Sequence, residues 1–248
     1  MLNSKSLYRR ILIKLSGEAL MGDGVELFDS NAVTGIMQQI KDVVDCGIGI
    51  GIVIGGGNII RGNEADKLKL DRINVDYMGM LSTIINAIAL KDFLSQVDIG
   101  AVIYSSIGMG NVIKSYNRED ALKDLNNDNV VIFAGGTGNP LFTTDSAAAL
   151  RAIEINADLI IKATKVDGVY DSDPKMNPSA KKYNHLSFLD AINKNLKIMD
   201  LTAFDLCKNH GIDIHVCNIF TPNTLKDVIY GEPIGTLIYS SSLKPGCC

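Results

Sequence analysis

The chain has 248 residues, of which 46% are hydrophobic and 21% are charged, and its formal net charge is −4 at pH 7. This length and composition predict a globular protein that buries a large core as one domain, with residues 1–8 and 241–248 as frayed tails. Lysines and arginines are few and scattered, which excludes an extended basic surface for nucleic acid. No apolar run reaches the roughly 18 residues of a membrane span and no signal peptide is recognisable, so we expect a cytoplasmic protein without membrane contact.

The predicted elements alternate between strands and helices along the chain. Short continuous apolar runs such as residues 10–15 indicate buried strands, whereas residues 32–44 carry apolar side chains at helical spacing. Buried strands separated by helices predict an α/β fold, a three-layer αβα sandwich with a mostly parallel central sheet. The predicted strands are 10–15, 48–54, 99–104, 130–133, 157–162, 212–216 and 235–239, and the predicted helices are 32–44, 76–94, 118–125, 147–155, 201–209 and 225–230.

Cysteines and histidines give no metal-ligand pattern. The five cysteines form no CxxC pair, and the three histidines are spread along the chain without a Cys/His cluster. We therefore expect reduced thiols, with Cys46, Cys207 and Cys217 in the core and no metal held by protein side chains alone.

The stretch from Ala134 to Ser146 reads A-G-G-T-G-N-P-L-F-T-T-D-S and lies between a predicted strand and an alanine-rich helix. Its glycines allow positive φ angles and let main-chain amides approach an anion closely. Residues 143–146 lie where the N-terminus of the helix has unsatisfied amides and the positive end of its dipole. This run is typical of a nucleotide site, although each glycine alone would indicate only a turn.

Three further polar loops follow strands and, in a parallel sheet, meet this stretch at the carboxyl edge. They are residues 14–18 (K-L-S-G-E), residues 55–58 (G-G-G-N) with Arg61 beyond them, and residues 162–173. The chain has no G-x-x-x-x-G-K-[ST] P-loop, no G-x-G-x-x-G fingerprint at its first helix and no protein-kinase motifs. Another phosphate-binding α/β fold is therefore expected.

Five motifs, in this order, resemble the bacterial uridylate kinases of the amino acid kinase fold family, and the likeness runs from about Arg9 to Tyr239. These enzymes are nucleoside monophosphate kinases that are not of the P-loop type. The motifs are K-L-S-G-E-A-L at 14–20, V-I-G-G-G-N-I-I-R-G at 53–62, D-Y-M-G-M at 76–80, G-T-G-N-P with F-T-T-D-S-A-A within 136–148, and K-A-T-K-V-D-G-V-Y at 162–170.

The resemblance implies two nucleotide sites. Glycine amides, the forked donor of Arg61 and the ribose-accepting carboxylate of Asp76 suit such ligands. The residues implied for ATP are Lys14, Leu15, Ser16, Gly17, Gly57, Arg61, Thr164, Tyr170 and Asp173. The residues implied for UMP are Gly56, Asp76, Thr137, Gly138, Asn139, Pro140, Leu141, Phe142, Thr143 and Thr144. Which of Thr143 and Thr144 contacts the pyrimidine and which the phosphate stays open.

The implied reaction is transfer of the ATP γ-phosphoryl group to UMP in pyrimidine nucleotide biosynthesis, with Mg²⁺ held through the nucleotide phosphates. Lys14 is the first choice for stabilising the transferring group and Lys162 the second. Asp145 would orient a lysine, or Mg²⁺ and water, and Asp200 is a further candidate for this polar network. The alternative for Asp145 is a plain helix cap.

The resemblance also implies inhibition by UTP and a homo-oligomer, expected as a hexamer built from three dimers. Residues 76–94 support assembly, because their apolar side chains cover nearly the whole helix circumference; the alternative is that residues 105–125 of the same chain cover the second face. Relatives activated by GTP carry basic residues on this helix and the following strand, and the aligned residues Lys91, Ser95 and Val102 depart from that pattern, so whether GTP activates this protein stays open. The unusual loop at residues 21–26 leaves the effector response open. The two apolar sides are Met78, Leu81, Ile85 and Ile88, and Met80, Ile84, Ala87, Leu90 and Leu94.

Two other functions remain possible from the sequence. The same fold phosphorylates carboxylates such as glutamate, although the T-G-N-P-L-F-T-T run at residues 137–144 favours UMP. Other proteins of this fold bind ligands without phosphoryl transfer, as oxoanion stores or regulatory subunits. The presence of Lys14, Arg61, Asp145 and Lys162 favours catalysis.

Overall fold

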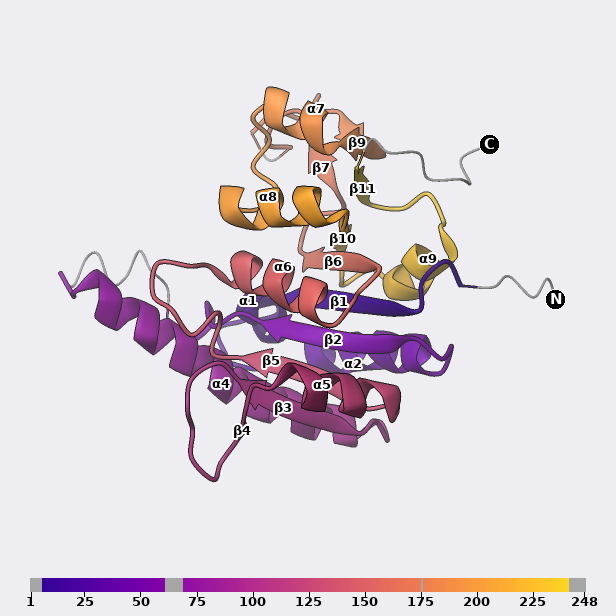
Figure 1. The fold of residues 1–248 in the computed structure, drawn as a ribbon. Helices are drawn as coiled ribbons and strands as arrows, with labels where there is room; N and C mark the ends of the chain where they lie inside the picture. The colour runs from indigo at the N-terminus through magenta and orange to yellow at the C-terminus, as the bar shows by residue number, and fades with distance from the viewer. Residues whose placement is uncertain (1–5, 61–68, 175, 241–248) are drawn as a thin grey trace.

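A computed structural model describes residues 6–60, 69–174 and 176–240. Its centre is a nine-stranded sheet in the order β4-β3-β5-β2-β1-β6-β10-β11-β9 (Figure 1). All neighbouring strands are parallel except β10 and β11. A small hairpin, β7 with β8, lies outside this sheet. The strands are β1 (Arg10–Leu15), β2 (Gly49–Ile54), β3 (Ala101–Ser105), β4 (Lys114–Ser115), β5 (Val130–Ala134), β6 (Leu159–Thr164), β7 (Val169–Tyr170), β8 (Lys182–Tyr183), β9 (His185–Ser187), β10 (Asp213–Asn218) and β11 (Thr236–Tyr239).

Helices cover both faces of the sheet, as expected for buried parallel strands. Figure 1 shows α5, α6 and α8 in front of the sheet and α2 and α4 behind it. Successive strand residues alternate between two separate apolar cores, one under each helical layer. The predicted three-layer α/β sandwich is confirmed. The helices are α1 (Gly17–Met21), α2 (Ser30–Val44), α4 (Arg72–Ser95), α5 (Arg118–Asn126), α6 (Thr144–Glu154), α7 (Phe188–Asn193), α8 (Leu201–His210) and α9 (Thr224–Tyr230).

The register of the two central strands fixes the first feature of the site. Ile13 and Ile161 belong to the core beneath α2, so the next residue of each strand faces the α6 side. Those residues are Lys14 and Lys162, which are direct partners in the β1–β6 pairing. Both lysines therefore lie on one face of the sheet, near its carboxyl edge.

Many predicted boundaries differ from the structure by one or more residues, and three of these differences have a clear physical cause. The helix expected at 147–155 begins at Thr144, because Thr143 caps it, and the helix expected at 76–94 begins at Arg72, because Asp71 caps it. The strand expected from Ala157 begins at Leu159, since the Ala157 amide donates to the Ala152 carbonyl at 2.9 Å. The short elements α1, α7, β4, β7, β8 and β9 carry too few residues for a periodic pattern and were not predicted.

Residues 6–8 are bound to the rest of the protein. Residues 1–8 were expected to be frayed, yet the Leu7 amide donates to the Ile229 carbonyl at 3.0 Å and the Ser6 hydroxyl donates to the Tyr8 carbonyl at 2.9 Å. These contacts tie residues 6–8 to α9. Of the expected core cysteines, Cys207 and Cys217 are buried, whereas Cys46 is partly exposed.

Helix α4 is apolar on two faces. Met80, Ile84 and Leu90 are buried against the sheet, whereas Leu81 and Ile85 on the other side are 45% and 50% exposed. The alternative that residues 105–125 cover this second face is therefore wrong. By length and composition, α4 is the one described helix that could cross a membrane, but 44% of its most apolar window is buried inside the protein. The α4 stripe, which we define by its exposed apolar residues, comprises Ile73, Tyr77, Met78, Leu81, Ile85 and Ile88.

Buried His215 on β10 makes stability depend on pH. Its Nε2 lies 2.8 Å from the Ile234 carbonyl, and burial lowers its pKa from 6.5 to about 4. Between these values the unfolded chain binds a proton that the folded protein excludes, so folding stability falls as the pH falls from 6.5 to 4. We expect this residue to contribute about 3 kcal/mol of that loss. Denaturant unfolding of the protein and of His215→Gln between pH 6.5 and 4 measures this contribution. If the free energy of unfolding falls equally with pH in both proteins, His215 is not the cause.

Candidate active site

A buried carboxylate joins two lysines at the carboxyl edge of the sheet. Asp145, in the first turn of α6, lies with Oδ1 2.9 Å from Lys14 Nζ and Oδ2 2.7 Å from Lys162 Nζ. Lys162 also donates to the Ile198 carbonyl. The three side chains are between 13% and 17% exposed, so the cluster is largely desolvated but open to a ligand. Its ionised groups sum to one positive charge.

Burial and ion pairing have opposite effects on the pKa values of Asp145 and Lys162. Burial by itself raises the pKa of Asp145, but the charges of Lys14 and Lys162 outweigh it, so this pKa lies below its ordinary value. Burial lowers the pKa of Lys162, and the neighbouring Asp145 offsets only part of that effect. Asp145 therefore stays ionised at neutral pH and holds the lysines in place.

The glycine-rich turn before α6 has the backbone that its sequence predicts. Gly135, Gly136 and Gly138 have φ angles of +76°, +55° and +82°. Thr143 is the N-cap of α6, and its hydroxyl accepts from the Asp145 and Ser146 amides at 3.1 and 3.3 Å. The alternative of Asp145 as the helix cap is therefore wrong, since that role belongs to Thr143.

Asp200 belongs to the same polar network. Thr143 donates its hydroxyl hydrogen to the Asp200 carboxylate, and the Ser146 hydroxyl lies 3.1 Å from Oδ1 of that residue. Asp200 also caps α8 by accepting from the Ala203 amide at 2.9 Å. The predicted candidate thus links the starts of α6 and α8 beside the lysine cluster, without a hydrogen bond to either lysine among the described residues.

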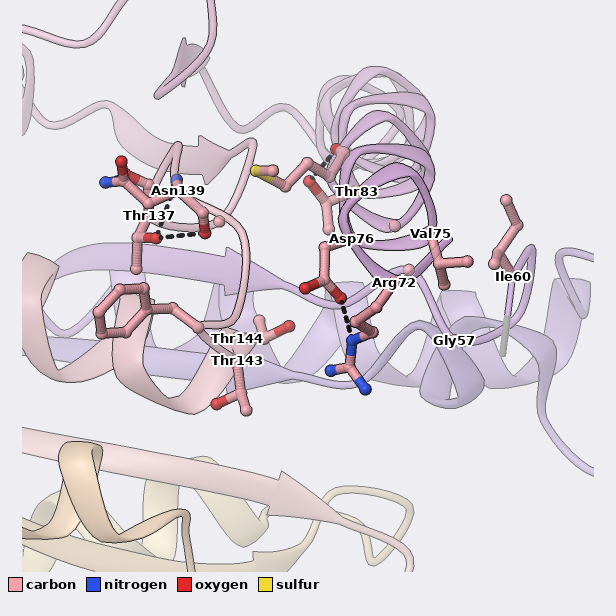
Figure 2. A pocket seen from close by; sticks show the side chains of 15 residues that line it. Gly57, Ile60, Arg72, Val75, Asp76, Thr83, Thr137, Asn139, Thr143 and Thr144 are labelled. Atoms are coloured by element: carbon pink, nitrogen blue, oxygen red, sulfur yellow. Dashed lines mark hydrogen bonds and ion pairs between the residues drawn. The ribbon is translucent and has the colours of Figure 1, made fainter. Parts of the chain in front are cut away.

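A cavity of about 250 Å³ lies between α4 and the glycine-rich turn, and we call it the α4 cavity (Figure 2). Figure 2 shows Asp76 on the α4 side, with Thr137, Asn139, Thr143 and Thr144 on the turn. Seven of the ten predicted UMP residues line the cavity. The full lining is Gly56, Gly57, Ile60, Arg72, Val75, Asp76, Gly79, Met80, Thr83, Gly136, Thr137, Asn139, Phe142, Thr143 and Thr144.

Gly138, Pro140 and Leu141 are not in this lining, in contrast to the other predicted UMP residues. Gly138 packs against a neighbouring loop: an added Cβ would lie 2.9 Å from the Ser106 carbonyl oxygen. Leu141, at a φ of +73°, donates its amide to Asp76 Oδ2 at 2.8 Å. Gly138 therefore supports the turn where it packs against Ser106, and Leu141 ties the turn to α4 through Asp76.

Two residues with polar side chains in the α4 cavity were missed by sequence reasoning. Arg72 donates Nε to Asp76 Oδ1 at 3.0 Å, which fixes the second oxygen of that carboxylate. Its position four residues before Asp76 was an available signal, because such pairs lie on one helix face. Thr83 accepts the Gly135 amide at 2.8 Å and joins α4 to the turn, and nothing in the sequence distinguishes it from any other helical threonine.

A second cavity, of about 570 Å³, opens beyond the end of β6, and we call it the β6 cavity. Its lining includes Thr164, Tyr170 and Asp173, the three residues predicted for the adenine and ribose of ATP, and it reaches Lys162. Residues 194–198 supply the opposite wall, although no sequence motif pointed to them. Lys162 and Asp145 thus lie between the β6 cavity and the threonines that line the α4 cavity.

Between the cavities, the backbone of the loop after β1 comes very close to the loop after β2. A Cβ on Gly17 would lie 2.9 Å from the Gly55 carbonyl oxygen and 3.0 Å from the Gly57 nitrogen. Ser16 is the N-cap of α1, and its side chain makes no capping hydrogen bond. These features leave main-chain amides at a helix start for an anion. Arg61, predicted for the same phosphates, lies outside the described residues.

This arrangement fits phosphoryl transfer between two anionic ligands. Cationic groups held by Asp145 lie where two cavities approach each other, and such groups stabilise charge on a transferring phosphoryl group. No cluster of three or more potential metal ligands occurs among the described residues, so the donor set offers no cage for a cation. Mg²⁺ commonly binds through substrate phosphates with few protein ligands, which fits this site.

Comparison with known proteins gives the family. The chain is 50% identical over 234 residues to the uridylate kinase of Pseudoalteromonas atlantica, covering 94% of this chain and 95% of that protein. The uridylate kinase of Legionella pneumophila (strain Paris) is 46% identical over the same coverage. The crystal structure of UMP kinase from Bacillus anthracis superposes with a TM-score of 0.92 at 40% identity, covering 95% of this chain and 97% of that one. Residues 9–218 match the amino acid kinase family, and the chain belongs to this family.

Proposed function

We propose that the protein transfers the γ-phosphoryl group of ATP to UMP, giving UDP for pyrimidine nucleotide biosynthesis. The observation that carries the proposal is the Lys14–Asp145–Lys162 cluster between two cavities. Seven of the residues expected for UMP line the α4 cavity, together with Gly57, which was expected for ATP, and the three residues expected for adenine and ribose line the β6 cavity. The names of the similar proteins support the choice of UMP as acceptor.

In this mechanism the protein supplies position and charge more than acid–base chemistry. The second pKa of a phosphate monoester is about 6, so UMP is already mostly dianionic at neutral pH and needs no strong general base. Lys14 stabilises the charge that spreads over the transferring group, and Lys162 assists from the ATP side. Asp145 keeps both ammonium groups pointed at the junction.

We further propose that Mg²⁺ accompanies ATP, bound by its phosphate oxygens. When bound, the ion would neutralise charge on these phosphates. Asp145 faces one lysine with each of its oxygens, so its role in this proposal is to orient the two ammonium groups.

The proposal is tested by a coupled assay with ATP, Mg²⁺ and a series of acceptors. We expect UMP to be converted to UDP, with CMP and dCMP poor acceptors, because polar groups placed for uracil and a 2′-hydroxyl lose their partners with other ligands. Glutamate serves as the acceptor for the carboxylate-kinase alternative. Equal turnover of CMP and UMP would remove the UMP assignment, and no turnover of any acceptor would favour a ligand-binding protein. Adding UTP to the same assay tests our proposal that it inhibits the reaction.

We also propose that the protein is a homo-oligomer, a hexamer built from dimers, acting in the cytoplasm. The α4 stripe supports assembly, because an exposed apolar face along one long helix is typical of a contact surface. A self-complementary contact there would be a two-fold interface, and three dimers would close a ring.

A charged residue in the α4 stripe should break this assembly. We expect light scattering to give six times the chain mass of 26.8 kDa, and Leu81→Lys to lower it because burying a lysine at an apolar contact is costly. Val112→Lys, which changes a more exposed apolar residue outside α4, should leave the mass unchanged. A monomer at micromolar concentration would refute assembly, and a Leu81→Lys protein of full size would place the contact elsewhere.

A further inference from the structure

A buried arginine lies behind the glycine-rich turn, outside both cavities. Arg151 of α6 is 6% exposed, and its guanidinium carbon lies 3.7 Å from the centre of the Tyr116 ring. It pairs with Glu154 through Nη1 and donates from Nη2 to the Ser106 hydroxyl oxygen at 3.0 Å. The Tyr116 hydroxyl donates to the same Glu154 oxygen at 2.8 Å. We call Ser106, Tyr116, Arg151 and Glu154 the Arg151 cluster.

The Arg151 cluster is electrically neutral, because Glu154 balances Arg151. Its influence on an anionic ligand is therefore one of position and not of net charge. None of its four members lines the α4 or the β6 cavity. An ion pair that is taken out of water is rarely more stabilising than apolar side chains of similar volume. The Arg151–Glu154 pair therefore needs another reason to be present.

Ser106 connects the Arg151 cluster to the turn. Its hydroxyl donates to the Gly136 carbonyl oxygen at 2.8 Å, and its oxygen accepts from Arg151, which fixes the direction of that hydroxyl. The Gly136–Thr137 peptide is trans, so its N–H points away from the carbonyl that Ser106 holds. No acceptor for the Thr137 amide occurs among the described residues, and Thr137 lines the α4 cavity. The anchored carbonyl thus leaves a main-chain donor available on the cavity side.

We propose that Ser106 and Arg151 are positioning residues for the acceptor nucleotide: they hold the Gly136–Thr137 peptide so that the Thr137 amide donates to UMP. The inference rests on the proposed function, since it takes UMP to be the occupant of the α4 cavity. Without Ser106, this peptide can rotate more freely about ψ of Gly136, because a glycine without a Cβ has the least restricted backbone.

The test measures UMP binding by calorimetry, and the KM for ATP in the coupled assay, for the protein and four variants. Ser106→Ala should weaken UMP binding about threefold to tenfold, the size of one hydrogen bond, and leave the KM for ATP unchanged. Arg151→Lys, which keeps the charge but loses the second donor, should weaken it similarly. The double variant should bind no more weakly than the worse single variant, because Arg151 acts through Ser106. Ser105→Ala is the matched control, since its hydroxyl donates to the Ile107 carbonyl at 2.7 Å and not to the turn.

Each outcome either supports or overturns the positioning role of Ser106 and Arg151. Unchanged UMP affinity in Ser106→Ala, an equal loss in Ser105→Ala, a matching rise in the KM for ATP, or full additivity in the double variant would overturn the positioning role while leaving the proposed function intact. Failure of the unaltered protein to bind UMP would overturn both, and it is seen before any variant is made. Ser106→Ala removes a single hydroxyl, so the test stands even if an Arg151 variant fails to fold.

Discussion

Replacing Lys14 by alanine is expected to lower kcat on the order of 10² to 10³, the cost of removing one donor aimed at developing charge. The KM for UMP should change far less, because the positive charge matters most when negative charge spreads over the transferring phosphoryl group. Lys14 lies 2.9 Å from Asp145, on the strand next to Lys162, and is only 15% exposed. Steady-state kinetics with ATP and UMP measure the effect.

Lys41→Ala provides the control for this experiment. Lys41 is likewise a lysine with a bound ammonium group, which donates to the Val97 carbonyl at 3.0 Å, but it is on α2 and lines neither cavity. Its removal should leave kcat and KM unchanged. A near-normal kcat in Lys14→Ala would show that Lys14 only neutralises Asp145, and Lys162 would then be the leading candidate.

The second large effect is expected for Asp145→Asn, in both stability and activity. The substitution leaves two buried ammonium groups facing each other without a counter-charge, and removing one partner of a buried pair costs about 3 kcal/mol. The loss should shrink as the pH rises. Burial already lowers the pKa of Lys162, so the folded variant releases this proton before the unfolded chain does, and higher pH therefore favours folding. Denaturant unfolding at neutral pH and near about pH 9.5 measures both effects.

A double variant separates charge repulsion from lost packing. Lys14→Met in the Asp145→Asn background removes one of the two unpaired charges and keeps the side-chain volume, so it should restore part of the stability but none of the activity. If the second change only adds further instability, repulsion between the lysines is not the cause of the first loss.

How far the sequence predicts this site can be seen at the lysines. Apolar periodicity located β1 and β6, and the rule that ligands bind at carboxyl edges brought Lys14, Asp145 and the glycine-rich turn together, as the structure has them. That Asp145 holds both lysines at once depends on the strand register and on the start of α6. Residues 143–146 indicate the start of α6, but the strand register is not visible in the sequence, because pairing partners are set by contacts far apart along the chain.

The residues that line or support the cavities show more clearly what the sequence does not predict. Thr83 and Ser106 support the glycine-rich turn from two different elements, yet each is a common residue in an unremarkable local sequence. Residues 194–198 form a wall of the β6 cavity from a segment without a motif. Such residues are found only when the chain is folded, because their role depends on what lies opposite them and not on their neighbours in sequence.

The pairing of Lys14 with Lys162 has a consequence for how activity tolerates insertions and deletions. Side chains alternate between the faces of a strand, so deleting one residue from β6 upstream of Lys162 would send its ammonium group into the apolar layer beneath α2. The same slip would bring Ile161 to the face of α6. A single deletion in β6 would then abolish catalysis and folding together, and no partly active variant would lie between. We therefore expect natural length variation in this chain's relatives to accumulate in the loops and to spare the two central strands.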